Sequence, residues 1–200
     1  MNEALRRIGR TLWLALLLGL LGVPLAMAGP TVSIGPTLAT AGVGSFVDIT
    51  VDITAVTDLY AYQFDLDFDP LILSALSIDE GPFLQSGGTT FFLPGMIDNA
   101  LGSITFTANS LIGAVPGANG DGTLVVARFF ALGLGSSQIN LSGMALIDST
   151  LTDISFTSVG GTVVVSSVVP EPGGMLLVGV GLLALIGASR RRWPLGGIVP

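Results

Sequence analysis

Carboxylates are the side chains that could carry chemistry in this sequence. The 200 residues include no Cys and no His. This composition excludes thiolate nucleophiles, disulfides, imidazole bases, Ser-His-Asp triads and His-ligated zinc or copper sites. Two kinds of carboxylate chemistry remain: a calcium site built from oxygen ligands, and a pair of acids that hydrolyses a glycosidic bond.

Asp65, Asp67 and Asp69 form the densest group of carboxylates. They alternate with apolar residues in LYAYQFDLDFDP, so a strand would place all three on one face, each about 7 Å from the next. Calcium takes roughly six to eight oxygen ligands, which usually converge from a loop. Two interpretations stay open: a calcium site, with Asp69 at the strand end as a ligand and Asp121 in NGDG as a second candidate, or a solvated acidic face that blocks strand pairing.

Asp79 and Glu80 are the candidates for a catalytic acid pair. Glu80 is the only Glu between the two ends of the chain, and both residues lie in the stretch IDEGPF. A glycosidase needs two carboxyls facing each other across a cleft, one of them in an apolar setting that raises its pKa. Adjacent residues in a turn rarely oppose each other in this way, so the sequence predicts a protein that is not an enzyme.

Phe91 and Phe92 are candidates for ligand contact. Neighbouring residues of a strand point to opposite faces, so one of the two rings must point outward. An outward ring could stack on a sugar ring. The alternative is that the loop EGPFLQSGG covers it.

Short β-strands must position all of these residues. Apolar and polar residues alternate with a period of two in SFVDITVDIT and LYAYQFDLDFDP, and later runs such as GTLVVARFFAL are bounded by turn residues. No internal window of helical length carries a 3.6-residue period with caps. About eight or nine strands in residues 29–168, without helical crossovers, predict an all-β sandwich of two antiparallel sheets.

The first 28 residues have the pattern of a secretory signal peptide. Arg6, Arg7 and Arg10 precede a long apolar run, and Ala26 and Ala28 are the small residues that fit the peptidase. We therefore expect residues 1–28 to be removed after Ala28 and the rest of the chain to be exported.

The segment between the two ends is strongly acidic. It keeps one of the seven basic residues, Arg128, and twelve of the fourteen acidic residues, which gives a net charge of −11. This charge repels nucleic acid and anionic lipid surfaces. Nucleic acid is therefore excluded as a partner.

The same segment resembles a cohesin domain. The resemblance rests on DLYAYQFDLDFDPLILSALSIDEGPFL, SLIGAVPGANGDGTLVVARFFAL and GGTVVV, and covers roughly residues 31 to 166. It implies a jelly-roll sandwich of about nine strands and a binding role, because cohesins hold dockerin modules and share their architecture with carbohydrate-binding modules. It also implies docking on the sheet whose strand ends at Asp69, through Gln63 with Asp65 and Asp67.

The tail, residues 169–200, resembles a PEP-CTERM sorting signal of Gram-negative bacteria that make exopolysaccharide. The signal has three parts: Pro170-Glu171-Pro172, an apolar segment at 173–189, and Arg190-Arg191-Arg192. A helix of that length reaches about 25 Å, only just enough for a transmembrane span, and the arginines stay cytoplasmic. The resemblance implies an exosortase-type partner, an inner-membrane intermediate, and delivery to the cell surface or extracellular matrix.

These observations predict an exported, non-catalytic binding module that recognises polysaccharide or a dockerin-like protein in the extracellular matrix. No cofactor is expected apart from the calcium considered above. The alternative is a structural matrix or surface protein whose acidic surface self-associates through calcium.

Overall fold

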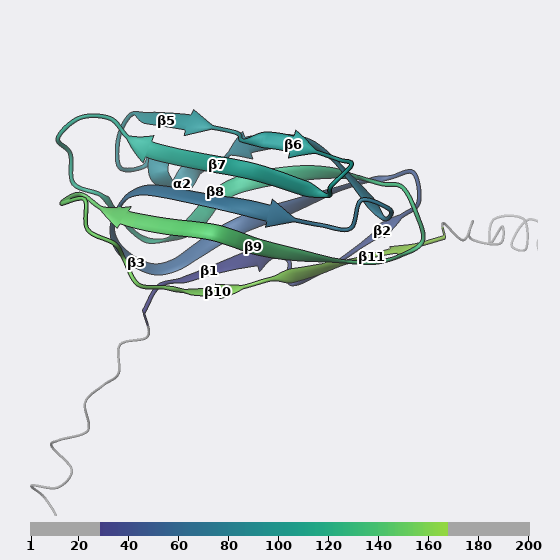
Figure 1. The fold of residues 1–200 in the computed structure, drawn as a ribbon. Coiled ribbons are helices and arrows are strands. Elements are labelled where there is room, and N and C mark those ends of the chain that lie inside the picture. Colours follow the sequence, from purple (N-terminus) through teal and green to yellow (C-terminus); the bar gives the residue numbers. More distant parts are fainter. Residues whose placement is uncertain (1–28, 168–200) are drawn as a thin grey trace, which may run out of the picture.

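The computed structural model describes residues 29–167, which form eleven β-strands and one short helix (Figure 1). The elements are β1 (Thr31–Gly35), β2 (Leu38–Gly42), β3 (Phe46–Asp67), β4 (Leu73–Glu80), α2 (Pro82–Gln85), β5 (Thr90–Leu93), β6 (Met96–Asp98), β7 (Ser103–Leu111), β8 (Ala118–Ala131), β9 (Gly135–Asp148), β10 (Thr157–Val159) and β11 (Gly161–Ser166). The predicted all-β class is confirmed. The signal peptide at 1–28 and the sorting segment at 169–200, with its transmembrane helix at 173–189, lie outside the described residues; between 29 and 167 no helix is long and apolar enough to cross a bilayer.

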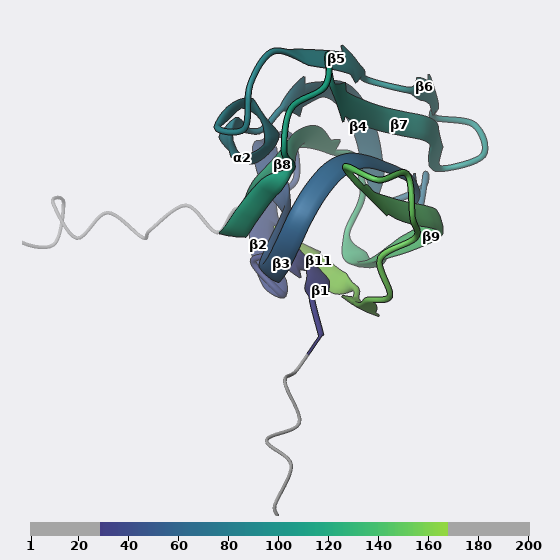
Figure 2. The ribbon, with the colours of Figure 1, turned by 90° about the vertical axis from the view of Figure 1, so that its left-hand side faces the viewer.

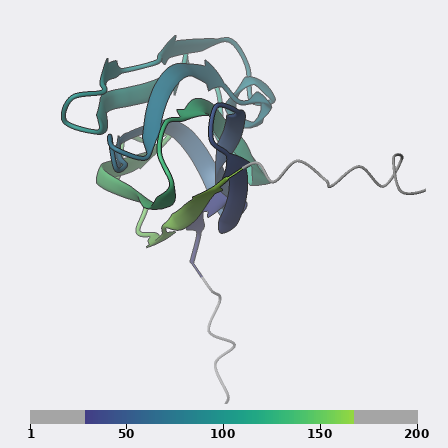
Figure 3. The ribbon, with the colours of Figure 1, turned by 90° about the vertical axis from the view of Figure 1, so that its right-hand side faces the viewer.

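Strand β3 connects the two layers of the fold. Its first part pairs with β1 and β8, and its last part pairs with β7 and β9. Between these parts Ala55 and Asp58 adopt positive φ angles of 55° and 60°, and the register with β8 shifts. The irregular stretch lets β3 curve from one layer into the other (Figures 2 and 3).

The sheet is mixed and curled, which corrects the expectation of two antiparallel sheets with about nine strands. β1 runs parallel to β10, and β2 runs parallel to β11. The alternation of residues along a strand carries no information on the direction of its neighbour, so the sequence pattern does not predict the parallel pairs. The extra strands arise where an edge is interrupted: Pro94 has no N–H and Gly95 has a φ of 81°, and they separate β5 from β6.

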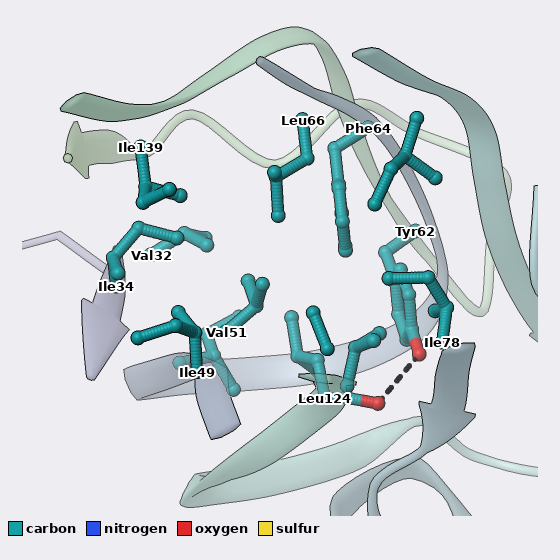
Figure 4. Packing of buried hydrophobic residues seen from close by; sticks show 14 of the residues in the cluster. Val32, Ile34, Ile49, Val51, Tyr62, Phe64, Leu66, Ile78, Leu124 and Ile139 are labelled. Atoms are coloured by element: carbon teal, nitrogen blue, oxygen red, sulfur yellow. Dashed lines mark hydrogen bonds between the residues drawn. The ribbon is translucent and has the colours of Figure 1, made fainter. Parts of the chain in front are cut away.

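One continuous apolar core fills the space between the layers (Figure 4). The predicted inward faces of β3 are confirmed, since Ile49, Val51, Phe64 and Leu66 are all buried. The buried Tyr62 hydroxyl donates a hydrogen bond of 2.8 Å to the carbonyl of Leu124. Helix α2, which the sequence analysis did not predict, begins at a proline and buries two of its four side chains.

Candidate functional site

Four neighbouring strands, β9, β3, β7 and β5, turn one side of their layer to solvent. The buried residue Tyr62 on β3 pairs with the buried Asn109 on β7 and Leu146 on β9. Residues one position before and after this row must therefore point outward. The two outward rows are Ile147–Ala61–Ser110–Phe91 and Ala145–Gln63–Ala108–Leu93. We call this surface the β9–β3–β7–β5 face.

An apolar hollow of about 240 Å³ lies on this face. Small side chains on β9, β3 and β7 leave the space, and larger apolar side chains border it. The border consists of Phe91, Leu93, Phe106 and Ile147. The rings of Phe91 and Phe106 are 60% and 54% exposed. The volume lies below the roughly 300–1,000 Å³ of small-molecule pockets, so the hollow suits one inserted side chain or ring.

The outward position of Phe91 confirms that one ring of the Phe91–Phe92 pair faces solvent. Phe92 packs against the core instead. With 60% of Phe91 exposed, the loop of residues 80–88 does not bury the ring. An exposed aromatic ring is thus available for contact with a ligand.

Asp65 sits between two irregularities in the neighbouring strands. Its Oδ1 accepts a hydrogen bond of 2.7 Å from the backbone N–H of Phe106, which has a φ of 60°. On the other side lies Gly143, with a φ of 58°, where an added Cβ would stand 2.8 Å from Asp65 Oδ2. Because Phe rarely adopts positive φ, the Asp65 carboxylate stabilises the conformation that points the Phe106 ring outward.

The three residues expected on a partner-binding face do lie together. Gln63 lines the hollow, and Asp65 and Asp67 follow on the same side of β3. Asp67 Oδ2 accepts a hydrogen bond of 2.9 Å from the Ser142 hydroxyl. Phe106 could not be identified as a site residue from the sequence, because its outward position depends on a bulge in β7 at Thr105–Phe106, opposite Asp65.

A buried polar network supports the hollow from beneath. Asn109 Nδ2 donates to Glu80 Oε1 at 2.7 Å. Burial raises the pKa of the Tyr62 hydroxyl above its ordinary value, so this group stays protonated. Burial alone would also raise the pKa of Glu80, but hydrogen bonds from Thr90, Gln85 and Asn109 outweigh it and lower that pKa.

The candidate acid pair is not arranged for hydrolysis. Asp79 and Glu80 are adjacent on β4, so their side chains leave opposite sides of the strand. Asp79 is exposed and accepts a hydrogen bond from Ser77, whereas Glu80 bonds the Asn109 amide. The lowered pKa of Glu80 is the opposite of what a general acid needs.

The other outer surface, formed by β1, β3, β8 and β4, is mainly polar, and its exposed ring, Phe46, packs against Phe130 with ring centroids 5.5 Å apart. Arg128 makes a bidentate ion pair with Asp48, with N···O distances of 2.7 and 2.8 Å, and this hydrogen bonding lowers the pKa of Asp48. Asp52 accepts hydrogen bonds of 2.7 Å from the hydroxyls of Thr50 and Thr123. Of the two outer surfaces, the β9–β3–β7–β5 face is thus the one with an unpartnered apolar centre.

The two candidate calcium ligands bond backbone amides. Asp69 Oδ1 accepts from the N–H of Leu71 at 2.9 Å, and Asp121 Oδ1 accepts from the N–H of Ala55 at 2.6 Å. In the part of the chain that the structure describes, no three His, Cys, Asp or Glu side chains gather in a way that could hold a metal ion. Calcium binding stays a prediction of the sequence.

Four carboxyl groups have lowered pKa values in the folded protein, so we expect acid to destabilise the fold. Hydrogen bonds lower the pKa of Asp48, Asp58 and Asp148, and that of Glu80 is also lowered, from ordinary values of 3.8 for Asp and 4.5 for Glu. A group whose pKa is lower in the folded state stabilises it above the unfolded pKa and loses this contribution as the pH falls through the folded pKa. We therefore expect the free energy of unfolding, measured by urea titration, to decline from about pH 5 to about pH 3. A constant value over this range would contradict the assignment.

Comparison with known proteins places this arrangement in a family. The sequence matches the family model of the cohesin domain over residues 30–165, which is more than half of the chain. The chain belongs to the cohesin domain family. A cohesin module is non-catalytic, which supports the predicted absence of enzyme chemistry for residues 30–165. A search of curated proteins finds no match.

Solved cohesin structures share the fold of this chain. A non-cellulosomal cohesin from Archaeoglobus fulgidus has 18% identity and a TM-score of 0.56, over 70% of this chain and 93% of that one. The sixth cohesin of Acetivibrio cellulolyticus scaffoldin B, in complex with the Cel5 dockerin, has 19% identity and a TM-score of 0.57 over 70% and 100%. The Coh-OlpA cohesin of Clostridium thermocellum, in complex with Doc918, has 15% identity and a TM-score of 0.57 over 69% and 99%.

The tail of this cohesin matches a second family model. The PEP-CTERM protein-sorting motif covers residues 168–192, which include the Pro-Glu-Pro motif and the three arginines. The match confirms the resemblance seen in the sequence. It implies an exported protein that an exosortase sorts.

Proposed function

We propose that this cohesin domain docks a protein partner on its β9–β3–β7–β5 face, with the apolar hollow at the centre. The observation that carries the proposal is the contrast between the two outer surfaces. One surface engages its charged groups in an ion pair and in hydrogen bonds to hydroxyls, and the other leaves Phe91, Phe106 and Ile147 around an unfilled apolar space. Apolar centres with aromatic residues are typical of protein interfaces.

The charge of the domain favours a basic partner. Its single cation, Arg128, is already paired with Asp48, while Asp65 and Asp67 lie beside the hollow. A partner with cationic groups around one apolar side chain would complement this face and would be steered towards it. A dockerin-like module, as held by the Acetivibrio and Clostridium cohesins described above, is the leading candidate.

Polysaccharide is the second candidate, favoured by the exposed ring of Phe91. Aromatic rings stack on sugars, but sugar recognition also needs several converging polar groups. Besides Tyr62, whose hydroxyl already bonds the Leu124 carbonyl, the polar residues that line the hollow are Gln63, Asn109 and Ser110. This lining favours protein over polysaccharide.

Site-specific crosslinking tests the docking face. A photoreactive residue at Phe91 is compared with one at Leu38 on β2; both positions are 60% exposed, and only Phe91 lines the hollow. Secreted proteins and purified dockerin modules are offered in one arm, and extracellular polysaccharide in the other. We expect a protein to crosslink at Phe91 and not at Leu38. Equal labelling at both positions, or binding to polysaccharide alone, would contradict the protein-docking proposal.

We further propose that the tail is cut off once it has carried the domain through export, so that the mature cohesin reaches the cell surface or extracellular matrix of a Gram-negative bacterium. The support is the order of the chain: a signal-peptide pattern at 1–28, the domain, and the sorting motif at 168–192.

Changing the sorting motif is expected to prevent removal of the tail. In a host with the exosortase, the mature wild-type protein should lack Arg190, Arg191 and Arg192 in its intact mass. Glu171→Gln should instead yield a membrane-bound form that retains them, because the recognised carboxylate is gone. Glu80→Gln removes the same charge inside the domain and serves as the control. Normal processing of Glu171→Gln would show that the exosortase does not recognise the carboxylate of this residue.

A further inference from the structure

Large apolar side chains are exposed at one end of the domain, where several turns meet. Gly44 in the β2–β3 turn donates to the carbonyl of Ala131 at 2.8 Å, and Leu132 donates to the carbonyl of Ile72 at 2.8 Å. Phe68 donates to the carbonyl of Gly102 at 2.8 Å, which joins the β6–β7 turn to the same end. The exposed apolar residues in and directly beside these turns, which we call the apolar rim, are Val43, Phe46, Leu71, Leu101, Leu132 and Leu134, with exposed fractions from 39% to 80%.

The described chain leaves the domain at this rim. Val43 donates a hydrogen bond of 3.0 Å to the carbonyl of Ser166, the last residue of β11, which ends at the right of Figure 1. The sorting motif begins at residue 168, and its apolar segment begins at Gly173. Six residue steps from Ser167 to Gly173 can span at most about 20 Å.

This tether keeps the rim close to the bilayer whenever the tail spans the membrane. The hydrocarbon core is about 30 Å thick in a bilayer of about 40–45 Å, so each headgroup layer measures about 5–8 Å. The tether is long enough for the rim to touch the headgroups, and too short for the domain to move far from them. From this geometry we propose that the apolar rim rests in the lipid headgroup region until the tail is cut. The inference depends on the proposed membrane stage of sorting.

The charges of the domain are compatible with the same orientation. Strands β8 and β9 each run fourteen residues between the rim and the opposite end. Four acidic residues, Asp58, Asp121, Asp148 and Asp153, lie at that opposite end, as their bonds with Ser149, Ala55, Thr152 and Ile147 show. With the rim against the membrane, these carboxylates lie farthest from the phosphates, which reduces the repulsion.

Three carboxylates near the rim, Asp67, Asp69 and Asp98, are already engaged. Asp67 accepts a hydrogen bond from the Ser142 hydroxyl. Asp69 accepts the N–H of Leu71, and Asp98 accepts the N–H groups of Ala100 and Leu101. A second copy of the domain is a poor occupant of the rim, because both copies carry a net charge of −11. Zwitterionic lipid is compatible with an apolar rim and requires no opposite charge.

Because the chain has no Cys, single cysteines can carry a fluorescent label without background. The exported protein, with its tail intact, is made in a host without the exosortase and reconstituted in phosphatidylcholine vesicles with spin-labelled lipid as quencher. Labels at Leu71→Cys and Leu132→Cys report on the rim. Leu151→Cys is the matched control, since Leu151 is 76% exposed at the opposite end and Leu71 is 80% exposed. Leu182→Cys reports on the tail.

We expect several-fold stronger quenching at positions 71 and 132 than at 151, and strong quenching at 182. Changing Phe46, Leu101 and Leu132 to Ser should then reduce the quenching of the label at 71. Quenching at 182 with none at 71 and 132 would show that the tail is in the membrane while the rim does not contact lipid. This outcome would overturn the proposal and favour a protein, such as the exosortase, as the partner of the rim. Absence of quenching at 182 would overturn both this inference and the membrane stage on which it rests.

Discussion

Asp65→Ala is expected to weaken docking of the partner at least about tenfold, a loss of about 1.4 kcal/mol or more. The Asp65 carboxylate accepts the N–H of Phe106, whose φ of 60° is costly for a Phe residue. Without that acceptor, the segment should relax and withdraw the ring from the hollow. Loss of a hydrogen bond to a charged group should also lower the free energy of unfolding by about 1.5–3 kcal/mol. Titration calorimetry with the partner that the crosslinking experiment identifies measures the loss of affinity. Urea unfolding measures the loss of stability.

Two further variants separate the shape of the hollow from the stability of the domain. Phe106→Gly removes the ring and suits the positive φ, so docking should weaken while the free energy of unfolding is retained. Asp67→Ala also removes a negative charge from this face. Asp67 accepts a hydrogen bond from the Ser142 hydroxyl and makes none to Phe106, so the hollow should persist in this variant. If Asp65→Ala and Asp67→Ala affected docking equally, charge rather than the position of Phe106 would be responsible.

The bulge in β7 at Thr105–Phe106, opposite Asp65, explains how the β9–β3–β7–β5 face acquires an apolar centre. In β7, Ile104 is buried, and strict alternation would send Phe106 inward on the same side. The irregularity reverses the alternation, so that Phe106 is exposed and Thr107 and Asn109 are buried. The buried polar residues find partners, since Thr107 donates to the carbonyl of Pro94 and Asn109 donates to Glu80.

Strand patterns in the sequence therefore predict part of this site and not all of it. The regular alternation of Tyr62, Phe64 and Leu66 was enough to predict which side of β3 is buried, and hence that Gln63 faces outward. The outward position of Phe106 could not be predicted in this way. It depends on the hydrogen bond between Asp65 and Phe106 itself, which lie 41 positions apart in the chain.

The same limit applies to the architecture. Period-two patterning established the strands, because burial on one side of a sheet depends on local sequence. The parallel pairing of β2 with β11 joins the two ends of the domain, and no local pattern records it. The apolar rim likewise gathers residues from separate turns, so that Phe46, Leu71 and Leu132 look like scattered surface residues in the sequence.

Phe129→Ala is expected to lower the free energy of unfolding by about 3–5 kcal/mol. Phe129 is fully buried on β8 and makes an edge-to-face contact with Phe68, with ring centroids 5.2 Å apart. An exported domain without Cys has no disulfide to compensate for a cavity in its core. Because domains of this kind have about 5–15 kcal/mol in total, the variant should be close to unfolding at ambient temperature.

Phe130→Ala provides a matched control at the neighbouring position. Phe130 points to the other side of β8 and packs its ring on the exposed Phe46 at 5.5 Å, so its loss should cost only about 0.5–1.5 kcal/mol. Urea unfolding followed by circular dichroism compares the two variants under identical conditions. Equal destabilisation by both would mean that the core between the layers is not what holds this domain together, since the two residues differ only in the side of the strand they occupy.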